Sequence, residues 1–173
     1  MDFERLIELL SYTIPALITG AVALYFFKFH TDNEEKRRNF LLVKEKQNKA
    51  LPLQLQAYER MALFLERISP EKLLIRVKPN GKNALNYQNK LILSIDQEYE
   101  HNLAQQIYMS ETCWNAIVAA KNATIQLIRM SHATEGVETS DDLREKIIQN
   151  TMENDNPTKT ALSYLKEEVR KIF

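Results

Sequence analysis

The sequence predicts an all-α protein in which an N-terminal transmembrane helix continues into a stalk and leads to a cytoplasmic helical bundle of about five helices. Residues 9–27 carry no charged side chain. Only three glycines and five prolines occur in 173 residues, so few positions would break a helix. Apolar side chains in the rest of the chain recur every three or four residues, which is typical of helices with one buried face. These observations divide the chain into a transmembrane anchor (residues 1–30), a charged helical stalk (31–50) and a helical domain (51–173).

Residues 6–29 form the segment predicted to cross a membrane. A helix rises about 1.5 Å per residue, so a bilayer core about 30 Å thick requires about 20 mostly apolar residues. Pro15 lies near the start of the segment, where a missing N–H donor is tolerated. One alternative is a cleaved signal peptide, because Ala21-Val22-Ala23 has the form of a cleavage site, but the acidic start MDFER argues against it. A buried helix of a soluble protein is a third reading, and apolar residues on all sides of the helix disfavour it.

The distribution of basic residues predicts the orientation of the segment. Only Arg5 precedes its uncharged core, residues 9–27, whereas many basic residues follow that core: Lys28, Lys36, Arg37, Arg38, Lys44, Lys46 and Lys49. The positive-inside rule therefore places the N-terminus outside and the C-terminal domain in the cytoplasm. The same basic residues of the stalk, Lys36, Arg37 and Arg38 in particular, could contact anionic lipid headgroups.

Four small residues lie on one face of the predicted transmembrane helix. They are Thr13, Ala16, Gly20 and Ala23, at spacings of three, four and three. Small side chains allow two helices in a membrane to approach closely, so this face could pack against a partner helix or a second copy of the chain. Small residues are also common in transmembrane helices that make no such contact.

Composition narrows the class of protein. The formal net charge of the chain is zero, so no excess of positive charge favours a nucleic-acid partner. A single cysteine, Cys113, excludes an intramolecular disulfide and is typical of a reducing compartment. The chain contains no glycine-rich phosphate loop, no HExxH and no GxSxG motif, so we predict no enzymatic activity, no catalytic or metal-binding residues and no cofactor.

The first part of the domain is predicted to contain two helices. Pro52 opens a helix that ends near Ile68, in which two neighbouring rows of apolar residues form a broad buried face. Ser69-Pro70-Glu71 combines a cap, a proline at the first helical position and an acid in the first turn, which predicts a second, short helix. A strand over residues 73–77 is the alternative.

The second part of the domain is predicted to contain longer helices. Apolar stripes indicate helices over residues 85–109 and 111–130; Ser110 could cap the latter, although one helix through residues 85–133 is also compatible with the pattern. Thr139 and Asp142 resemble a capping box for a helix over residues 141–152. Asn156-Pro157 begins the last helix.

One polar block is the predicted site. It contains a possible hydrogen-bonded network of seven residues: Glu98, Glu100, His101, Asn102, Gln105, Gln106 and Tyr108. Glu98 and His101 form one Glu-x-x-His step, whereas di-metal bundles use two such steps with two further carboxylates. A solvated helix face is the plainer interpretation of the block.

Two segments, LPLQLQAYERMALFLERISP (residues 51–70) and EYEHNLAQQIYMS (residues 98–110), resemble a family of small single-pass membrane proteins of unknown function from Bacteroidota. The resemblance implies a bacterial inner-membrane location, and it implies no catalytic or ligand residues.

We therefore predict a scaffold or accessory subunit that is anchored in the membrane through residues 6–29 and holds a protein partner, or a second copy of the chain, at the cytoplasmic face. The alternative is a metal-binding or enzymatic bundle centred on Glu98 and His101.

Overall fold

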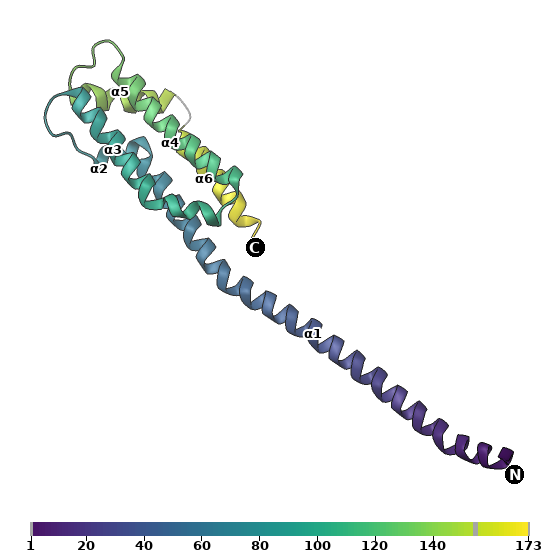
Figure 1. Cartoon of the computed structure of the whole chain (residues 1–173). Coiled ribbons are helices and arrows are strands. Elements are labelled where there is room, and N and C mark those ends of the chain that lie inside the picture. Colours follow the sequence, from purple (N-terminus) through teal and green to yellow (C-terminus); the bar gives the residue numbers. More distant parts are fainter. Residues whose placement is uncertain (1, 154–155, 173) are drawn as a thin grey trace. The chain divides into compact units, whose positions relative to one another are not determined.

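The computed structural model describes residues 2–153 and 156–172, and its regular elements are all helical (Figure 1). The predicted all-α class is confirmed. The elements are α1 (Asp2–Ile68), α2 (Pro70–Arg76), α3 (Ala84–Asn102), the 3₁₀ helix η1 (Leu103–Tyr108), α4 (Glu111–His132), α5 (Ser140–Glu153) and α6 (Pro157–Arg170). The chain divides into two compact units, residues 1–50 and residues 51–173, which are described separately below.

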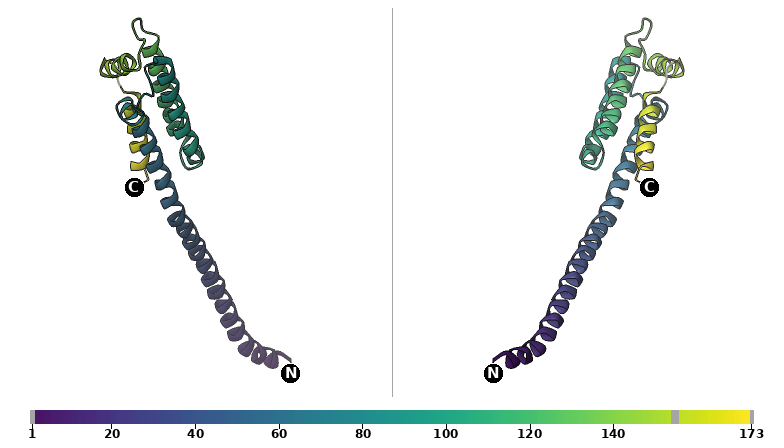
Figure 2. Two further views of the ribbon diagram at one scale, coloured as in Figure 1. Left: turned by 90° about the vertical axis from the view of Figure 1, so that its left-hand side faces the viewer. Right: turned by 90° about the vertical axis from the view of Figure 1, so that its right-hand side faces the viewer.

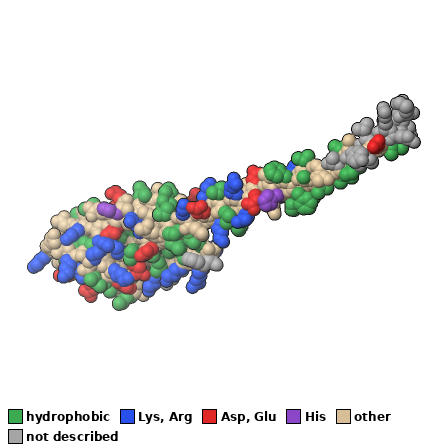
Figure 3. Space-filling view, turned by 90° about the horizontal axis from the view of Figure 1, so that it is seen from below, with side chains coloured by type: hydrophobic (Ala, Val, Ile, Leu, Met, Phe, Trp, Pro, Cys, Tyr) green, Lys and Arg blue, Asp and Glu red, His purple; other side chains and the backbone are tan. Residues whose placement is uncertain are grey.

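The first unit is the N-terminal part of α1, and its described side chains are exposed. Within the described part of the chain, α1 is the one helix long and apolar enough to cross a membrane, with an 18-residue window of mean hydropathy 1.3 and no buried residue in it. Figure 3 shows hydrophobic side chains along this part of the helix. Thr13, Gly20 and Ala23 of the predicted packing face are exposed, and the side chain of Ala16 lies outside the described residues.

The second unit is a helical bundle with one hydrophobic core. Helices α3 and α4 lie side by side and antiparallel, connected by η1, and α6 packs against α4 (Figures 1 and 2). The core takes side chains from every α-helix of the unit, including Phe64, Leu73, Ile95, Ile117, Ile147 and Leu165. Both predicted apolar rows of the helix before Ile68 contribute to this core, because Tyr58 and Leu65 of one row and Met61 and Phe64 of the other are buried.

Three helix starts follow the predicted capping pattern. The side-chain oxygen of Ser110 accepts a hydrogen bond from the Cys113 amide at 3.2 Å, which begins α4 and rules out a single helix over residues 85–133. Asn156 caps α6 through a 3.0 Å bond from the Thr158 amide.

The capping box at the start of α5 is also present. The Asp142 amide donates to Thr139 Oγ1 at 3.2 Å, and the Thr139 amide donates to Asp142 Oδ2 at 2.8 Å. The pKa of Asp142 is lowered, first by the hydrogen bonds from Thr139, because they stabilise the ionised carboxylate.

Two predicted helix boundaries are wrong. Pro52 does not open a helix, because α1 continues through it to Ile68. Pro52 and Asn48 are exposed, so the carbonyl group that proline leaves unpaired four residues earlier can be hydrated. Helix α3 ends at Asn102 instead of residue 109, and the tighter helix η1 replaces its last turns.

The predicted cap at Ser69 is likewise wrong in its detail. Helix α2 does begin at Pro70, so the alternative strand over residues 73–77 is excluded. However, the Ser69 hydroxyl donates a hydrogen bond to the Glu66 carbonyl oxygen, at 3.0 Å, at the end of α1. It makes no capping hydrogen bond to the start of α2. The fixed φ of Pro70 supports the start of α2 without it.

Candidate functional site

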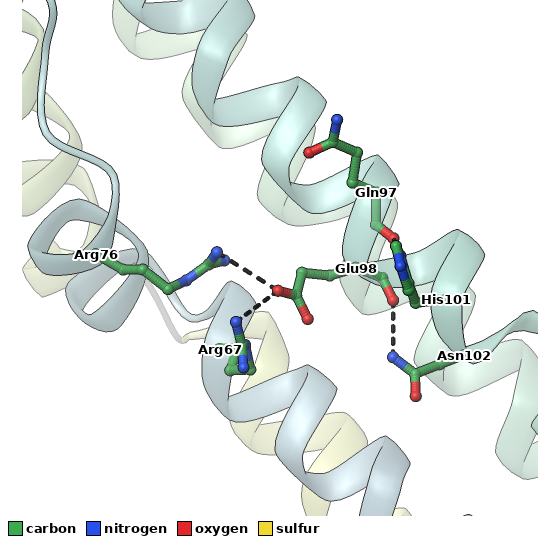
Figure 4. Close-up of polar contacts among 6 residues, drawn as sticks. All are labelled: Arg67, Arg76, Gln97, Glu98, His101 and Asn102. Carbon is green, nitrogen blue, oxygen red and sulfur yellow. Dashed lines mark hydrogen bonds and ion pairs between the residues drawn. The ribbon is translucent and has the colours of Figure 1, made fainter.

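Glu98 is the centre of a charged cluster formed by three helices. Its Oε1 atom lies 2.7 Å from Arg67 Nη2 and 3.5 Å from Arg76 Nη1 (Figure 4). Arg67 lies in the last turn of α1 and Arg76 in the last turn of α2, where the partial negative charge of the helix end favours a cation. The carboxylate is therefore held by two guanidinium groups and cross-links α3 to the ends of α1 and α2.

The other residues of the predicted polar network do not form hydrogen bonds with one another's side chains. His101 is exposed, and its Nδ1 atom lies 2.8 Å from the Gln97 carbonyl oxygen. The Asn102 side chain donates to the Glu98 carbonyl oxygen at 2.8 Å (Figure 4). Four side chains make no hydrogen bond to any residue that the structure describes: those of Glu100, Gln105, Gln106 and Tyr108. The structure thus places Glu98, His101 and Asn102 on neighbouring turns but joins their side chains to backbone groups and arginines.

The same geometry bears on the metal-binding alternative. Among residues 2–153 and 156–172, no group of three or more His, Cys, Asp and Glu side chains could hold a metal ion. The Glu98 carboxylate forms ion pairs with two arginines, and the Nδ1 atom of His101 faces a backbone oxygen. Nothing in the described arrangement favours metal chemistry at Glu98 and His101.

A basic pocket lies beside the Glu98 cluster, between α3 and the segment that leaves α2. Its volume is about 490 Å³, and Arg76, Lys78, Lys90, Leu93, Ser94 and Gln97 are among the residues that line it. The Lys90 ammonium group donates to the Lys78 carbonyl oxygen at 2.8 Å and so connects the two walls.

The segment that forms one wall of the basic pocket is held in place by side chains of the bundle interior. The buried hydroxyl of Tyr87 donates to the Val77 carbonyl oxygen at 2.8 Å. Arg144 on α5 donates to that hydroxyl at 3.2 Å and to the Leu74 carbonyl oxygen at 3.0 Å. These bonds hold the segment after α2 against α3, so the pocket is a preformed feature of the bundle.

A second cluster gathers around Glu168 on α6. Glu168 Oε1 accepts hydrogen bonds from the Tyr58 hydroxyl and the Ser110 amide, each at 2.9 Å, and Oε2 accepts one from the Ser110 hydroxyl at 2.9 Å. The carboxylate lies at the start of α4, where the helix dipole favours a negative charge. We call Tyr58, Ser110, Cys113 and Glu168 the Glu168 cluster.

The Glu168 cluster shifts the pKa of three of its members. Burial raises the pKa of Glu168, but the hydrogen bonds that it accepts, first that of the Ser110 amide, outweigh this effect and hold that pKa below its usual value. Burial, followed by the hydrogen bond to Glu168, raises the pKa of Tyr58 to about 12. Burial, together with the nearby negative charge of Glu168, raises the pKa of Cys113 to about 12. Cys113 is therefore a protonated, buried thiol and is not suited to act as a nucleophile.

Sequence reasoning did not single out the Glu168 cluster, although two signals pointed to it. Glu168 follows Ala161 and Leu165 on the apolar face of α6, where a charged residue is out of place without partners. Tyr58 lies in a buried row of α1, and a buried hydroxyl requires a hydrogen-bond acceptor.

Comparison with known proteins places the chain in a family. The model of a family of unknown function, DUF7935, matches residues 4–172. The chain belongs to the DUF7935 family. No curated protein and no solved structure matches it. The DUF7935 match extends over both units of the chain and includes both the Glu98 cluster and the Glu168 cluster.

Proposed function

We propose that this DUF7935 protein is a membrane-anchored interaction protein without enzymatic activity. Residues 6–29 would cross the inner membrane of a bacterium once, with the N-terminus outside. Residues 51–173 would then hold a protein partner at the cytoplasmic face, as a scaffold or accessory subunit.

The observation that carries the membrane proposal is the exposure of large apolar side chains in the first unit. Leu17 is 71% exposed, Leu24 is 72% exposed and Phe27 is 72% exposed. Burying a side chain of this kind is worth about 1.5–3 kcal/mol relative to leaving it in water. A bilayer would remove this row of side chains from water, and the basic residues after Phe27 favour a cytoplasmic C-terminus.

The partner proposal is supported by an apolar surface on η1. Ile107 is 74% exposed, Leu103 is 41% exposed and no residue of η1 is buried. The Tyr108 carbonyl oxygen accepts a hydrogen bond from the Gln54 side chain at 3.1 Å, which fixes η1 against the last part of α1. Single exposed apolar side chains are common on protein surfaces; we infer a binding surface here because Leu103 and Ile107 are four residues apart on a backbone that is fixed against α1.

Crosslinking in native membranes, followed by affinity purification through a C-terminal tag and mass spectrometry, tests the partner. We expect one reproducible protein partner that Ile107→Ser removes. Ile75→Ser is the matched control, since Ile75 on α2 is also 74% exposed, and it should leave the complex intact. Recovery of the chain alone would contradict a scaffold role and favour self-association through Thr13, Gly20 and Ala23 instead.

A separate measurement tests the membrane topology. We expect the chain to fractionate with membranes and to resist extraction with carbonate. A reporter enzyme that is active only in the cytoplasm should be active when it is fused after residue 173. Activity of a reporter that works only in the periplasm would overturn the orientation without affecting the interaction proposal.

A further inference from the structure

The residues that line the basic pocket carry a net positive charge. Of the described residues that line it, Arg76, Lys78 and Lys90 are cationic and none is acidic. Glu98 does not line the pocket but forms an ion pair with Arg76. It also pairs with Arg67, so one negative charge is shared by two positive charges. The pocket therefore has an excess of positive charge although the chain as a whole is neutral.

The cationic groups of the pocket also have unused hydrogen-bond donors. A guanidinium has five N–H donors, and Arg76 approaches Glu98 through Nη1 alone, at 3.5 Å. The Lys78 ammonium group makes no hydrogen bond or ion pair with a residue in the described part of the chain. An ammonium has three donors, and Lys90 uses one of them for the Lys78 carbonyl oxygen.

Neutral polar groups add to this set. Ser94 and Gln97 line the same pocket from α3, and neither side chain makes a hydrogen bond to a described residue. Their positions on one face of α3, with Lys90 one turn earlier, follow from the spacing of three and four residues along a helix. The pocket thus presents charged and neutral donors on a rigid helix.

We propose that the basic pocket binds a phosphomonoester, with its phosphate group held by Arg76, Lys78 and Lys90. A phosphomonoester carries a charge of about −1.5 to −2 at neutral pH and three acceptor oxygens, which matches several unpaired donors. A volume of about 490 Å³ exceeds what a bare phosphate fills and is within the range of small-molecule sites. Leu93, which is 57% exposed, provides an apolar wall for the organic part of the ligand.

This chemistry has two possible sources, a soluble phosphorylated metabolite and the headgroup of phosphatidic acid. Both present a phosphomonoester, whereas phosphatidylglycerol presents a phosphodiester of lower charge. The proposal does not depend on the interaction role proposed above, because a site for a small anion could be present with or without a protein partner.

Isothermal titration calorimetry of the full-length protein tests the proposal, with adenosine 5′-monophosphate as the probe. The protein is held in nanodiscs of neutral phosphatidylcholine, and adenosine and sodium chloride at matched ionic strength are the blanks. We expect saturable binding of the monophosphate only. Since a lost charge-assisted hydrogen bond weakens binding by about tenfold, Lys78→Gln and Lys90→Gln should each reduce the affinity by about that factor.

Lys82→Gln is the matched control. Lys82 is an exposed lysine of the same segment that does not line the pocket, so this variant should bind like the wild type. Binding no stronger than that of adenosine, or equal affinity in the Lys78, Lys90 and Lys82 variants, would overturn the proposal. Circular dichroism of each variant confirms that the bundle is intact.

Nanodiscs that contain phosphatidic acid identify the source of the ligand. If the lipid headgroup occupies the pocket, these nanodiscs should suppress binding of the monophosphate, and nanodiscs with an equal charge of phosphatidylglycerol should not. If both lipids leave the binding unchanged, the pocket serves a soluble phosphomonoester. Suppression by both lipids to the same extent would show attraction to charge alone and would overturn a specific site.

Discussion

The Tyr58 hydroxyl on α1 donates a hydrogen bond to Glu168 Oε1 on α6 at 2.9 Å, so a buried phenol and a carboxylate join the first and last helices of the bundle. The same oxygen accepts the amide of Ser110, at the start of α4. One carboxylate thereby fixes three helices that are far apart in the sequence. A hydrogen bond to a charged group contributes more to stability than a bond between neutral groups.

Removing the Tyr58 hydroxyl should therefore destabilise the bundle. We expect Tyr58→Phe to lower the free energy of unfolding by about 1–2 kcal/mol, because Glu168 loses a charge-assisted hydrogen bond while the ring still fills the core. Denaturant unfolding of the full-length protein in detergent, followed by circular dichroism, measures this change. Tyr164→Phe is the control; Tyr164 is 49% exposed and should tolerate the change. Equal effects of the two variants would contradict a role for the Tyr58 hydroxyl.

The Glu168 carboxylate should make the bundle sensitive to acid. Folding lowers the pKa of Glu168, so its contribution to stability is complete above the unfolded-state pKa of about 4.3 and is lost as the pH falls through the lower folded-state value. The wild type should exceed Glu168→Gln in stability at neutral pH, and the difference should shrink below about pH 4.3. Unfolding curves at a series of pH values test this. A difference that grew as the pH fell would have the wrong sign.

Cys113 should resist alkylation in the folded protein. Its side chain is buried, and its pKa is raised to about 12, so the reactive thiolate is scarce at neutral pH. We expect iodoacetamide to modify Cys113 only after denaturation, as measured by mass spectrometry. In the Ser163→Cys variant, the introduced cysteine occupies an exposed position on α6 and should react in the folded state. Rapid modification of Cys113 in the folded protein would show that its surroundings open.

The helical class and most helix starts followed from the sequence because they depend on local chemistry. Ser110, Asn156 and the Thr139–Asp142 pair each bind amides within three residues, so their pattern is complete in a short segment. The prediction of a helix start at Pro52 is wrong for the opposite reason. Whether proline ends a helix depends on whether the unpaired carbonyl group reaches water, and that depends on the surroundings of the residue in space.

The partners of Glu98 and Glu168 could not be predicted from the sequence either, because the tertiary fold supplies them. The sequence predicts a network between Glu98 and residues of its own segment, whereas Glu98 pairs with Arg67 and Arg76 on two other helices. Glu168 and Ser110 are 58 residues apart in sequence and meet only because α6 packs against α4. A sequence pattern can mark a polar residue on an apolar face, but it cannot name the partner that the tertiary fold supplies.

Double-mutant cycles should show how much the Glu98 cluster contributes to stability. Arg67 is 52% exposed and Glu98 is 21% exposed, so solvent screens the 2.7 Å contact between them. We expect Arg67→Gln and Glu98→Gln to couple by less than about 1 kcal/mol, and added salt to reduce that coupling. The cycle of Arg67→Gln with Glu100→Gln is the control, because the Glu100 side chain makes no contact of this kind in the described chain, and it should show no coupling. Coupling of several kcal/mol between Arg67 and Glu98 would mean that the pair is far less hydrated than its exposure indicates.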